Sequence, residues 1–209
     1  GTEITKEERD LGKRARHASS YGLGGQTFAD SLLKDDVIRT PAECTAMIQA
    51  IHTADPEIPQ WQERTKREID RYGALTNSWG RTFLFPPGPR SADDYRSGFA
   101  FRPQSDVVDL LNQHGLIQMY RWLQEQEMES RLVMQFHDEL LFSCPPAEVW
   151  LVVEHLQECF RKPHNFYGTM LAMPIEVKIG TTMAFEHAFK RPPGREEIEQ
   201  AASGLTPRP

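Results

Sequence analysis

The tightest constraint on the fold is a short polar break between two β-prone runs. Residues 131–136 and 140–143 are rich in apolar side chains, and only His137, Asp138 and Glu139 separate them. So short a connection suits a tight antiparallel hairpin. The sequence therefore predicts a hairpin that carries three polar side chains at its tip.

Helical patterns fill the first part of the chain. Thr5, followed three residues later by Glu8, indicates a capped helix over 5–20, and a glycine-rich segment at 21–25 ends it. This half is therefore predicted to be α-helical up to a hairpin or extended loop. The further predicted elements are helices over 26–33, 41–54 and 59–71, and the hairpin or loop over 75–85.

The second part mixes helices with short strands. Residues 105–126 have the apolar spacing of a buried helix with an irregular point at Gly115, residues 146–160 repeat that spacing, and 175–179 alternate as a strand. Together with the hairpin, this predicts an α+β fold, in which helices cover one face of a small antiparallel sheet. We expect three parts: 1–74, 75–190, and a flexible tail at 191–209 that is rich in Pro, Glu and Gly.

Composition restricts the class of protein. Of 209 residues, 39% are hydrophobic, which is enough for a sizeable core, and no run of about 18 apolar residues is present to cross a membrane. Cys44, Cys144 and Cys159 form no Cys-x-x-Cys pair, so we expect reduced thiols, no zinc ribbon, and a cytoplasmic or nucleoid location. The net charge of −6 disfavours nucleic-acid binding over the whole surface, because that affinity comes from Lys and Arg.

Two adjacent carboxylates between apolar strands are costly unless a cation lies near them. Asp138 and Glu139 can supply oxygen ligands to Mg²⁺, which keeps several waters and needs only one or two protein carboxylates. The alternative is a solvent-exposed polar turn, in which Asp and Glu are common. The tripeptide alone leaves both interpretations open.

A stripe of polar and ring side chains lies on the first predicted helix. Arg9, Lys13, His17 and Tyr21 recur every fourth residue, and each four-residue step advances about 400°, so the four side chains share one side of the helix. Such a stripe can hold a triphosphate, with the cations on phosphate oxygens and the rings against a sugar and a base. A solvated charged helix, balanced by the acids of its first turns, is the alternative.

The stripe and the hairpin together resemble the family A DNA polymerases, the bacterial DNA polymerase I type. The fingers helix of that family has the pattern Arg-x3-Lys-x3-aromatic-x3-Tyr-Gly, and its palm motif Val/Phe-His-Asp-Glu-hydrophobic matches residues 136–140. The resemblance covers residues 3–188 and assigns 1–74 to the fingers and 75–190 to the palm. The fingers pattern is matched by Arg9, Lys13, His17, Tyr21 and Gly22. Further matches are Thr76 with Gly80-Arg81, which resembles the family's Thr-x-x-Gly-Arg loop, and Arg96, Gln104, the strand at 174–180, and Glu186-His187.

The resemblance implies how a nucleotide would be bound. Arg9 and Lys13 would hold the phosphates of the incoming nucleotide, and Lys13 would also protonate the leaving pyrophosphate. His17 would lie against the sugar and Tyr21 near the templating base. Gly22 would let the chain turn sharply after the helix.

The resemblance also implies the metal and DNA contacts. Asp138 would bind two Mg²⁺ ions with Glu139 as the weaker second carboxylate, and His137 would approach the primer end. Contacts that position the primer-template DNA without reading its sequence are implied for Arg81, Arg96 and Gln104. The cations assigned to the substrate face are Arg9, Lys13, Arg14, Arg16, Arg96 and Arg102.

The chain departs from the family in three respects. His17 stands where the family usually has Phe or Tyr, which bears on sugar discrimination, and Ala100 stands where it often has Asn. The family's Asp-Tyr/Phe-Ser-x-Ile/Leu-Glu motif, which supplies another metal-binding Asp, does not precede Arg9. We therefore expect the C-terminal fingers and palm portion of a viral or phage DNA-directed DNA polymerase, which adds dNTPs to a primer in DNA replication and is inactive without an N-terminal segment or chain.

Two other functions are compatible with the same residues. A degenerate palm could bind template-primer DNA, or act as a replisome module, without catalysis. An HD-type metal phosphohydrolase could be built on His137 and Asp138, but it would need further His and Asp ligands on helices, whereas β-prone runs flank the pair here.

Overall fold

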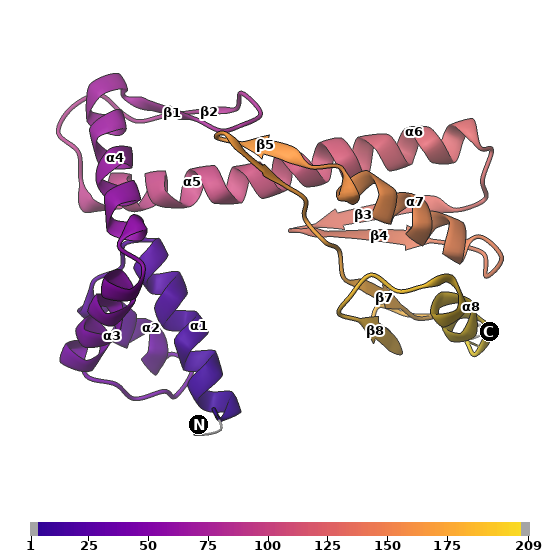
Figure 1. Ribbon diagram of the computed structural model, residues 1–209, viewed down its shortest axis with the longest axis horizontal. Helices are drawn as coiled ribbons and strands as arrows, with labels where there is room; N and C mark the ends of the chain where they lie inside the picture. The colour runs from indigo at the N-terminus through magenta and orange to yellow at the C-terminus, as the bar shows by residue number, and fades with distance from the viewer. Residues whose placement is uncertain (1–3, 206–209) are drawn as a thin grey trace. The chain divides into compact units, whose positions relative to one another are not determined.

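The computed structural model of the chain describes residues 4–205 (Figure 1). Its internal contacts divide the chain into two compact units between Gln104 and Ser105, and each unit is described by itself below. The expected boundary between fingers and palm after residue 74 rests on motifs rather than on these contacts, and it stays a prediction. Glu3 and residues 206–209 lie outside the described part of the chain.

Four helices open the first unit, and local capping signals set their starts. Thr5 Oγ1 accepts a hydrogen bond from the Glu8 amide at 3.2 Å, while the Thr5 amide donates to Glu8 Oε2 at 2.8 Å. Thr40 and Glu43 form the same capping box, and Pro41 takes the first helical position after it. The predicted helices are confirmed: α1 (Lys6–Ser20), α2 (Gly25–Leu33), α3 (Pro41–Ala54) and α4 (Glu57–Tyr72).

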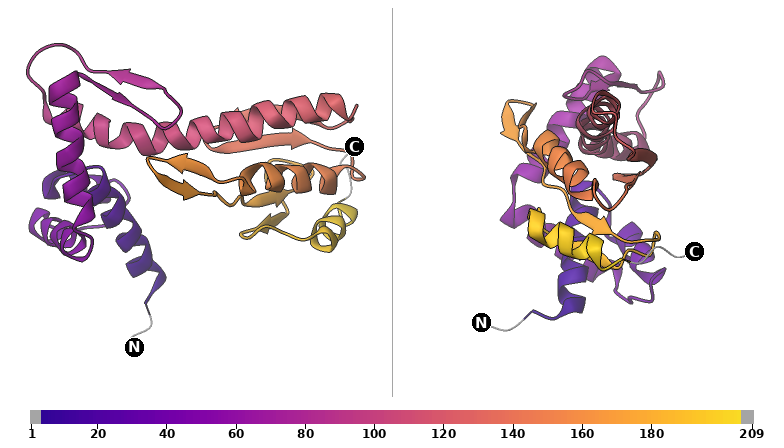
Figure 2. Two further views of the ribbon diagram at one scale, coloured as in Figure 1. Left: turned by 45° about the horizontal axis from the view of Figure 1, so that its top comes forward. Right: turned by 90° about the vertical axis from the view of Figure 1, so that its right-hand side faces the viewer.

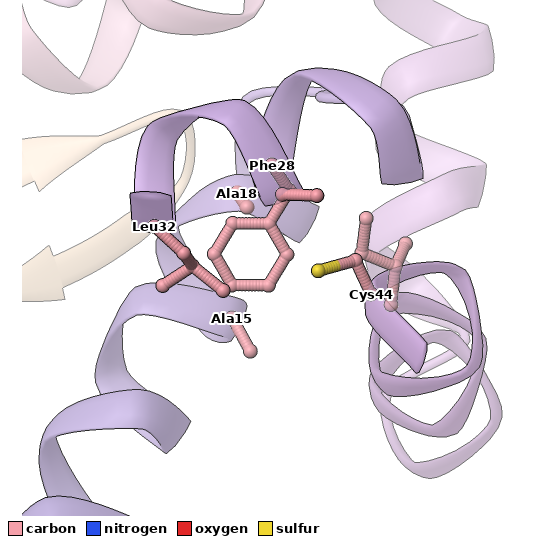
Figure 3. Close-up of a cluster of buried hydrophobic side chains, with 7 residues drawn as sticks. Ala15, Ala18, Phe28, Leu32 and Cys44 are labelled. Atoms are coloured by element: carbon pink, nitrogen blue, oxygen red, sulfur yellow. The ribbon is translucent and has the colours of Figure 1, made fainter. Parts of the chain in front are cut away.

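The helices α1, α2 and α3 share one apolar core, shown in Figure 3. Phe28 and Leu32 of α2 are buried against Ala15 and Ala18 of α1 and against Cys44 of α3. Burial of a Phe or Leu side chain stabilises a fold by roughly 1.5–3 kcal/mol, and the small alanines let the helices approach closely. This packing fixes one side of α1 and leaves its other side to the solvent.

The hairpin predicted over 75–85 is present after α4. It consists of β1 (Ala74–Thr76) and β2 (Thr82–Leu84), which pair antiparallel from Ala74↔Leu84 to Thr76↔Thr82. A small core of Ile69, Leu75 and Phe85 holds it against α4. The long helix α5 (Ala92–Leu110) follows, and it begins 13 residues before the predicted start at Ser105.

The second unit is built around a helix that becomes irregular where it meets the hairpin. A Cβ on Gly115 would lie 2.6 Å from Leu140 Cδ1 and 3.2 Å from the Phe160 ring, so glycine permits this close approach. The irregular point lies in a π-helix, a rare conformation that occurs mostly as a short bulge within α-helices. The elements are η1 (Leu111–Ile117), α6 (Gln118–Glu125), β3 (Arg131–Phe136), β4 (Glu139–Ser143), α7 (Val149–Arg161), β5 (His164–Phe166), β6 (Thr169–Leu171), β7 (Val177–Ile179), β8 (His187–Phe189) and α8 (Arg195–Ser203).

The α+β class is confirmed, and the strands of residues 4–205 are arranged as four separate two-stranded antiparallel sheets. The pairs are β1–β2, β3–β4, β5–β6 and β7–β8, each a hairpin of consecutive strands. The β3–β4 hairpin carries a register shift between Leu132 and Met134, and α6 contacts β3. The expected sheet is therefore divided into short ribbons, which rely on neighbouring helices for stability.

The prediction of a flexible tail at 191–209 is wrong for residues 195–203, which form α8. Ile198 of this helix is fully buried in a core with Val153 of α7 and Ile179 of β7. Figure 2 shows α8 alongside α7 in two further views. The Pro, Glu and Gly content of the tail does not reveal this helix. A few apolar residues at helical spacing are enough to pack it on a neighbouring helix.

Candidate functional site

The stripe predicted on α1 lies on its solvent-facing side. Arg9, Lys13 and His17 are exposed, and Tyr21 is half-buried at the C-terminal cap, with its ring centroid 4.4 Å from that of His17. Lys13 Nζ is 4.0 Å from the Asp10 carboxylate, an exposed contact of little energetic value. Arg9 forms no ion pair with any residue from 4 to 205. Two cations and two rings are thus available on one side of the helix.

Other cations of α1 are engaged within the first unit. Arg14 donates to Asp35 Oδ2 at 2.7 Å and to the Ser31 carbonyl at 3.1 Å. Arg16 forms an ion pair with Asp55, the cap residue of α3. These pairs fasten α1 to the ends of α2 and α3. The helix is therefore not uniformly solvated, because its cations divide into structural ones and available ones.

An open hollow of about 310 Å³ lies beside the stripe, between α1 and α2. An apolar floor next to cations suits a ring-shaped group that carries negative charge at one end. The cations and His17 therefore border a surface with room for a ligand. The residues that line the hollow are Lys13, Arg14, His17, Ala18, Leu23, Phe28 and Ser31.

The C-terminal end of α1 is fixed by contacts that the sequence does not reveal. Gln62 of α4 is buried, and its Nε2 donates to the carbonyls of Ser19 at 2.8 Å and Ser20 at 3.1 Å. Gly22 has φ +69°, and a Cβ there would lie 2.8 Å from the Phe99 ring. The turn predicted at Gly22 thus requires glycine for its backbone and for its packing. Gln62 carries no sequence signal, because its partners lie 42 and 43 positions away.

The hairpin tip is a two-residue loop. Phe136 pairs with Glu139, so Glu139 is the first residue of β4, and only His137 and Asp138 form the loop. His137 adopts a left-handed backbone with φ +52°, a conformation in which His is enriched among non-glycine residues. Asp138 is exposed, and its carboxylate accepts no hydrogen bond from residues 4–205. The hairpin therefore presents Asp138 outward at its tip.

Glu139, in contrast, already has a partner. Lys178 Nζ on β7 donates to Glu139 Oε1 at 2.5 Å. This hydrogen bond and the charge of Glu139 raise the pKa of Lys178 above its usual value. Sequence reasoning missed Lys178, because only the tertiary fold brings β7 to the hairpin. The two adjacent carboxylates thus differ in availability.

The hairpin residues fit part of a magnesium shell. Mg²⁺ prefers carboxylate oxygens and retains water, and Asp138 and Glu139 supply such oxygens at adjacent positions. In the described chain, no group of three or more His, Cys, Asp or Glu side chains gathers around a common point. A Mg²⁺ ion held by Asp138 would therefore complete its coordination with water and with other oxygen ligands.

The loop of the β1–β2 hairpin is organised by a residue that sequence reasoning passed over. Asn77 is buried, and its Oδ1 accepts from the amides of Trp79 at 3.0 Å and Arg81 at 2.9 Å. Three residues separate Thr76 from Gly80, so Asn77 and not Thr76 stands at the first position of a Thr-x-x-Gly-Arg spacing. This corrects the assignment of Thr76, and it leaves Arg81 exposed on an ordered loop.

The remaining sequence-predicted DNA contacts lie on α5. Arg96 pairs with Asp93 one turn earlier, and Gln104 is exposed. Arg102 makes a two-point contact with Glu68, at 2.9 Å and 2.5 Å, and its Nε donates to the Thr76 carbonyl at 3.0 Å. Arg102 therefore supports the hairpin, while Gln104 remains open to a ligand.

The candidate residues fall into both units. The stripe and the α5 residues belong to the first unit, whereas His137, Asp138 and Glu139 belong to the second. Along residues 4–205, every helix is too short or too polar to cross a lipid bilayer.

Comparison with known proteins identifies relatives of this chain. The family model described as "DNA polymerase family A" matches residues 1–187. The DNA polymerase of Bacillus phage SP01 is 24% identical over 210 residues, which covers 95% of this chain and 22% of that protein. The thermostable DNA polymerase I of Thermus thermophilus is 28% identical over 144 residues, which covers 66% of this chain and 16% of that protein. The chain thus spans about a fifth of the length of the curated relatives it matches.

A solved structure is similar in fold. It is titled "POL domain of Pol1 from M. smegmatis complex with DNA primer-template and dNTP", and it superposes with a TM-score of 0.68 at 18% identity. The match covers 78% of this chain and 29% of that one. At this identity the likeness establishes the fold.

Proposed function

Because the chain belongs to DNA polymerase family A, we propose that it is the fingers and palm portion of a DNA-directed DNA polymerase. Residues 1–74 would form the fingers portion and 75–190 the palm portion. The observation that carries the proposal is two available groups: the exposed cations Arg9 and Lys13 of α1, of which only Lys13 has an acid near it among residues 4–205, and the outward carboxylate of Asp138. A location in the cytoplasm, with the DNA, follows from this activity.

The first unit would bind the incoming nucleotide. Arg9 and Lys13 carry positive charge on the open side of α1, where triphosphate oxygens would displace water. Lys13 would also protonate the leaving pyrophosphate. His17 borders the hollow beside Lys13, where it would lie against the sugar. Tyr21 would stack near the templating base, and the fixed turn at Gly22 would keep its ring there.

The second unit would hold the metal and the primer end. Bound Mg²⁺ would act as a Lewis acid that stabilises the attacking and leaving oxygens of phosphoryl transfer. Asp138 would be its principal ligand from this chain, with Glu139 as the weaker carboxylate. His137, fixed beside Asp138 in the two-residue loop, would approach the primer end. Arg81, Arg96 and Gln104 would contact the primer-template backbone.

The proposed partners are primer-template DNA, dNTPs and an N-terminal polymerase segment or chain. Asp138 and Glu139 would supply only part of a two-metal site, because residues 4–205 gather no third acid around them. A further Asp from that N-terminal segment would complete the site. The chain alone would then be inactive.

The experiment is primer extension with Mg²⁺ and dNTPs, with the chain supplied together with the N-terminal polymerase segment. Asp138→Asn should reduce extension by roughly 10²–10³-fold, the order of loss expected when one group that stabilises transition-state charge is removed. Asp36→Asn, an exposed residue on the loop after α2, is the matched control and should extend primers normally. Extension that survives Asp138→Asn would refute Asp138 as a metal ligand. Efficient extension by this chain alone would refute the need for an N-terminal segment.

The same experiment tests the non-catalytic alternative. A template-primer binding module would bind duplex DNA with strong salt dependence and would never extend a primer. Its DNA affinity would also be indifferent to Asp138→Asn. That combination of results would replace the polymerase proposal.

A further inference from the structure

A tertiary ion pair joins the tip hairpin to a second hairpin of the same unit. Glu139 is the first residue of β4 and Lys178 the middle residue of β7, and Nζ lies 2.5 Å from Oε1. The two residues are 39 positions apart in the chain. Their contact is therefore made by the fold and not by local chain geometry.

The position of Lys178 is set by the core beneath it. Its neighbours in β7, Val177 and Ile179, are both buried in the core that includes α8, so alternation along the strand turns Lys178 to the opposite side. Lys178 also pairs with Ala188 of β8 in register. The buried side chains of Val177 and Ile179 thus fix the backbone from which the Lys178 side chain reaches the hairpin.

A second contact holds the ammonium group of Lys178. Nζ lies 5.9 Å from the centroid of the Phe185 ring, which belongs to the loop between β7 and β8. The amide of Phe185 donates to the Thr182 carbonyl at 3.2 Å, and this closes the loop on itself. The ammonium group is therefore held between a carboxylate and an aromatic face.

The charges around the tip are consequently asymmetric. Asp138 is near enough to Lys178 to act on it electrostatically, but the hydrogen bond goes to Glu139. A carboxylate that accepts a short charged hydrogen bond has less negative charge to offer a metal ion. Asp138 keeps its oxygens free.

We propose that Lys178 is a positioning residue of the metal site, which binds Glu139 as its counter-ion and leaves Asp138 as the carboxylate that meets the metal. The inference rests on the proposed polymerase function. It has a consequence for metal binding: the hairpin holds a divalent ion weakly until substrate phosphates bring more oxygens. Without Lys178, Glu139 regains a full negative charge, and one such charge about 6 Å from a divalent ion in water raises the affinity for that ion about tenfold; added salt reduces that factor.

The test is a titration of the isotope-labelled chain with Mn²⁺ alone, which follows the paramagnetic broadening of the amide signals of residues 136–140. Lys178→Met should lower the half-saturating Mn²⁺ concentration about tenfold at low ionic strength. Lys178→Arg keeps the charge and should stay within twofold of the wild type. Lys162→Met, which removes an exposed Lys at the end of α7, is the control for net charge and should also stay within twofold.

A second set of variants separates the two carboxylates. Adding Glu139→Gln to Lys178→Met should abolish the gain in Mn²⁺ affinity, because the gain comes from the released Glu139 carboxylate. Asp138→Asn should remove the broadening in both backgrounds. The β7–β8 amide signals report whether each variant keeps its fold, and Lys178→Gln replaces Lys178→Met if that variant does not.

The outcomes distinguish this inference from the proposed function. Mn²⁺ binding that depends on Asp138 but not on Lys178 would overturn the inference and leave the metal site standing. Broadening that ignores Asp138, or that never appears at residues 136–140, would overturn both. A tenfold gain in Lys178→Met that persists with Glu139→Gln would show a simple charge effect, and it would also overturn the role given to Glu139.

Discussion

The close packing around Gly25 at the start of α2 allows the effect of one substitution on folding stability to be predicted in sign and size. A Cβ at Gly25 would collide with Thr45 Oγ1, and it would lie 2.5 Å from the Pro41 carbonyl oxygen and 3.0 Å from the Thr45 amide nitrogen. The last two are backbone atoms of α3. They cannot rotate away as a side-chain tip can, so α2 and α3 must move apart.

The magnitude for Gly25→Ala follows from two terms. Overpacking of a close contact costs about 1–3 kcal/mol. The Thr45 hydroxyl donates to the Pro41 carbonyl at 2.8 Å and must give up or distort that bond, which costs about 1 kcal/mol more. We therefore expect Gly25→Ala to destabilise the α1–α3 cluster by about 2–4 kcal/mol.

Gly12 provides a control with the opposite sign. It lies in the exposed middle of α1, and a Cβ there would meet no atom within 4 Å. Alanine is favoured over glycine in a helix interior by about 1 kcal/mol. Gly12→Ala should therefore stabilise the cluster by about that amount. The same Gly→Ala change is then expected to lower the stability at position 25 and to raise it at position 12, because the packing around the two glycines differs.

Native-state hydrogen exchange is the appropriate assay, because two compact units can unfold separately and a single melting curve would mix them. Gly25→Ala should lower the opening free energies of amides in α1, α2 and α3 and leave those of α7 unchanged. Gly12→Ala should raise the values in α1. Unchanged protection in Gly25→Ala would refute direct contact between the start of α2 and the α3 backbone.

Two further predictions concern ion pairs and carboxylates. The Glu148 carboxylate accepts hydrogen bonds from Ser130 Oγ at 2.6 Å and from the Ser130 amide at 2.8 Å, which lowers its pKa below the ordinary 4.5. The stability that these hydrogen bonds add is present above the unfolded pKa of Glu148 and is lost as the pH falls through the lower folded pKa. Ser130→Ala should bring the Glu148 pKa back toward 4.5 in a carboxyl ¹³C titration. An unchanged Glu148 pKa in that variant would show that Ser130 does not cause the shift. Arg102→Lys cannot reproduce the two-point contact with Glu68 and should loosen the β1–β2 hairpin by about 1–2 kcal/mol. The reporter is exchange of the Asn77 amide, which donates to the Arg81 carbonyl at 2.9 Å, and full protection there would show that the hairpin does not depend on Arg102.

Elements with local signals were predictable from the sequence. Thr5 and Glu8, and then Pro41, carry the start of a helix within a few residues, so α1 and α3 were predicted within one residue of their bounds. The β3–β4 hairpin was predicted because a break of two or three residues between strands admits few alternatives. Such signals act over one turn and need no knowledge of the rest of the chain.

Elements that depend on distant contacts were missed. The helix α8 has mostly polar residues, and it is stable because Ile198 docks in a core with α7 and β7. Strands of three residues such as β5 and β8 are too short for any periodicity to appear. In both cases the decisive energy comes from tertiary packing, which a single sequence does not display.

In the candidate site, too, residues in local motifs were predictable from the sequence and residues brought in by distant contacts were not. The resemblance predicts roles for His137, Asp138 and Glu139, and the hairpin register adds that Glu139 belongs to β4 and that only two residues form the loop. Lys178 and Gln62 act on the site through contacts 39 to 43 residues away. A family pattern records ligands, whereas the groups that orient those ligands appear only when the chain is folded.

The cations show why placement matters more than number for a chain with a net charge of −6. Four of the six assigned from sequence to the substrate face form close ion pairs within the first unit, namely Arg14, Arg16, Arg96 and Arg102, whereas Lys13 lies 4.0 Å from Asp10. The acid beside a paired guanidinium neutralises part of its charge, so the pair attracts a phosphate less than a lone cation does. Arg9 has no such acid in the described part of the chain, and Lys13 is only loosely held by Asp10. Electrostatic attraction of a triphosphate to α1 would therefore arise from these two side chains, even though the chain as a whole repels anions.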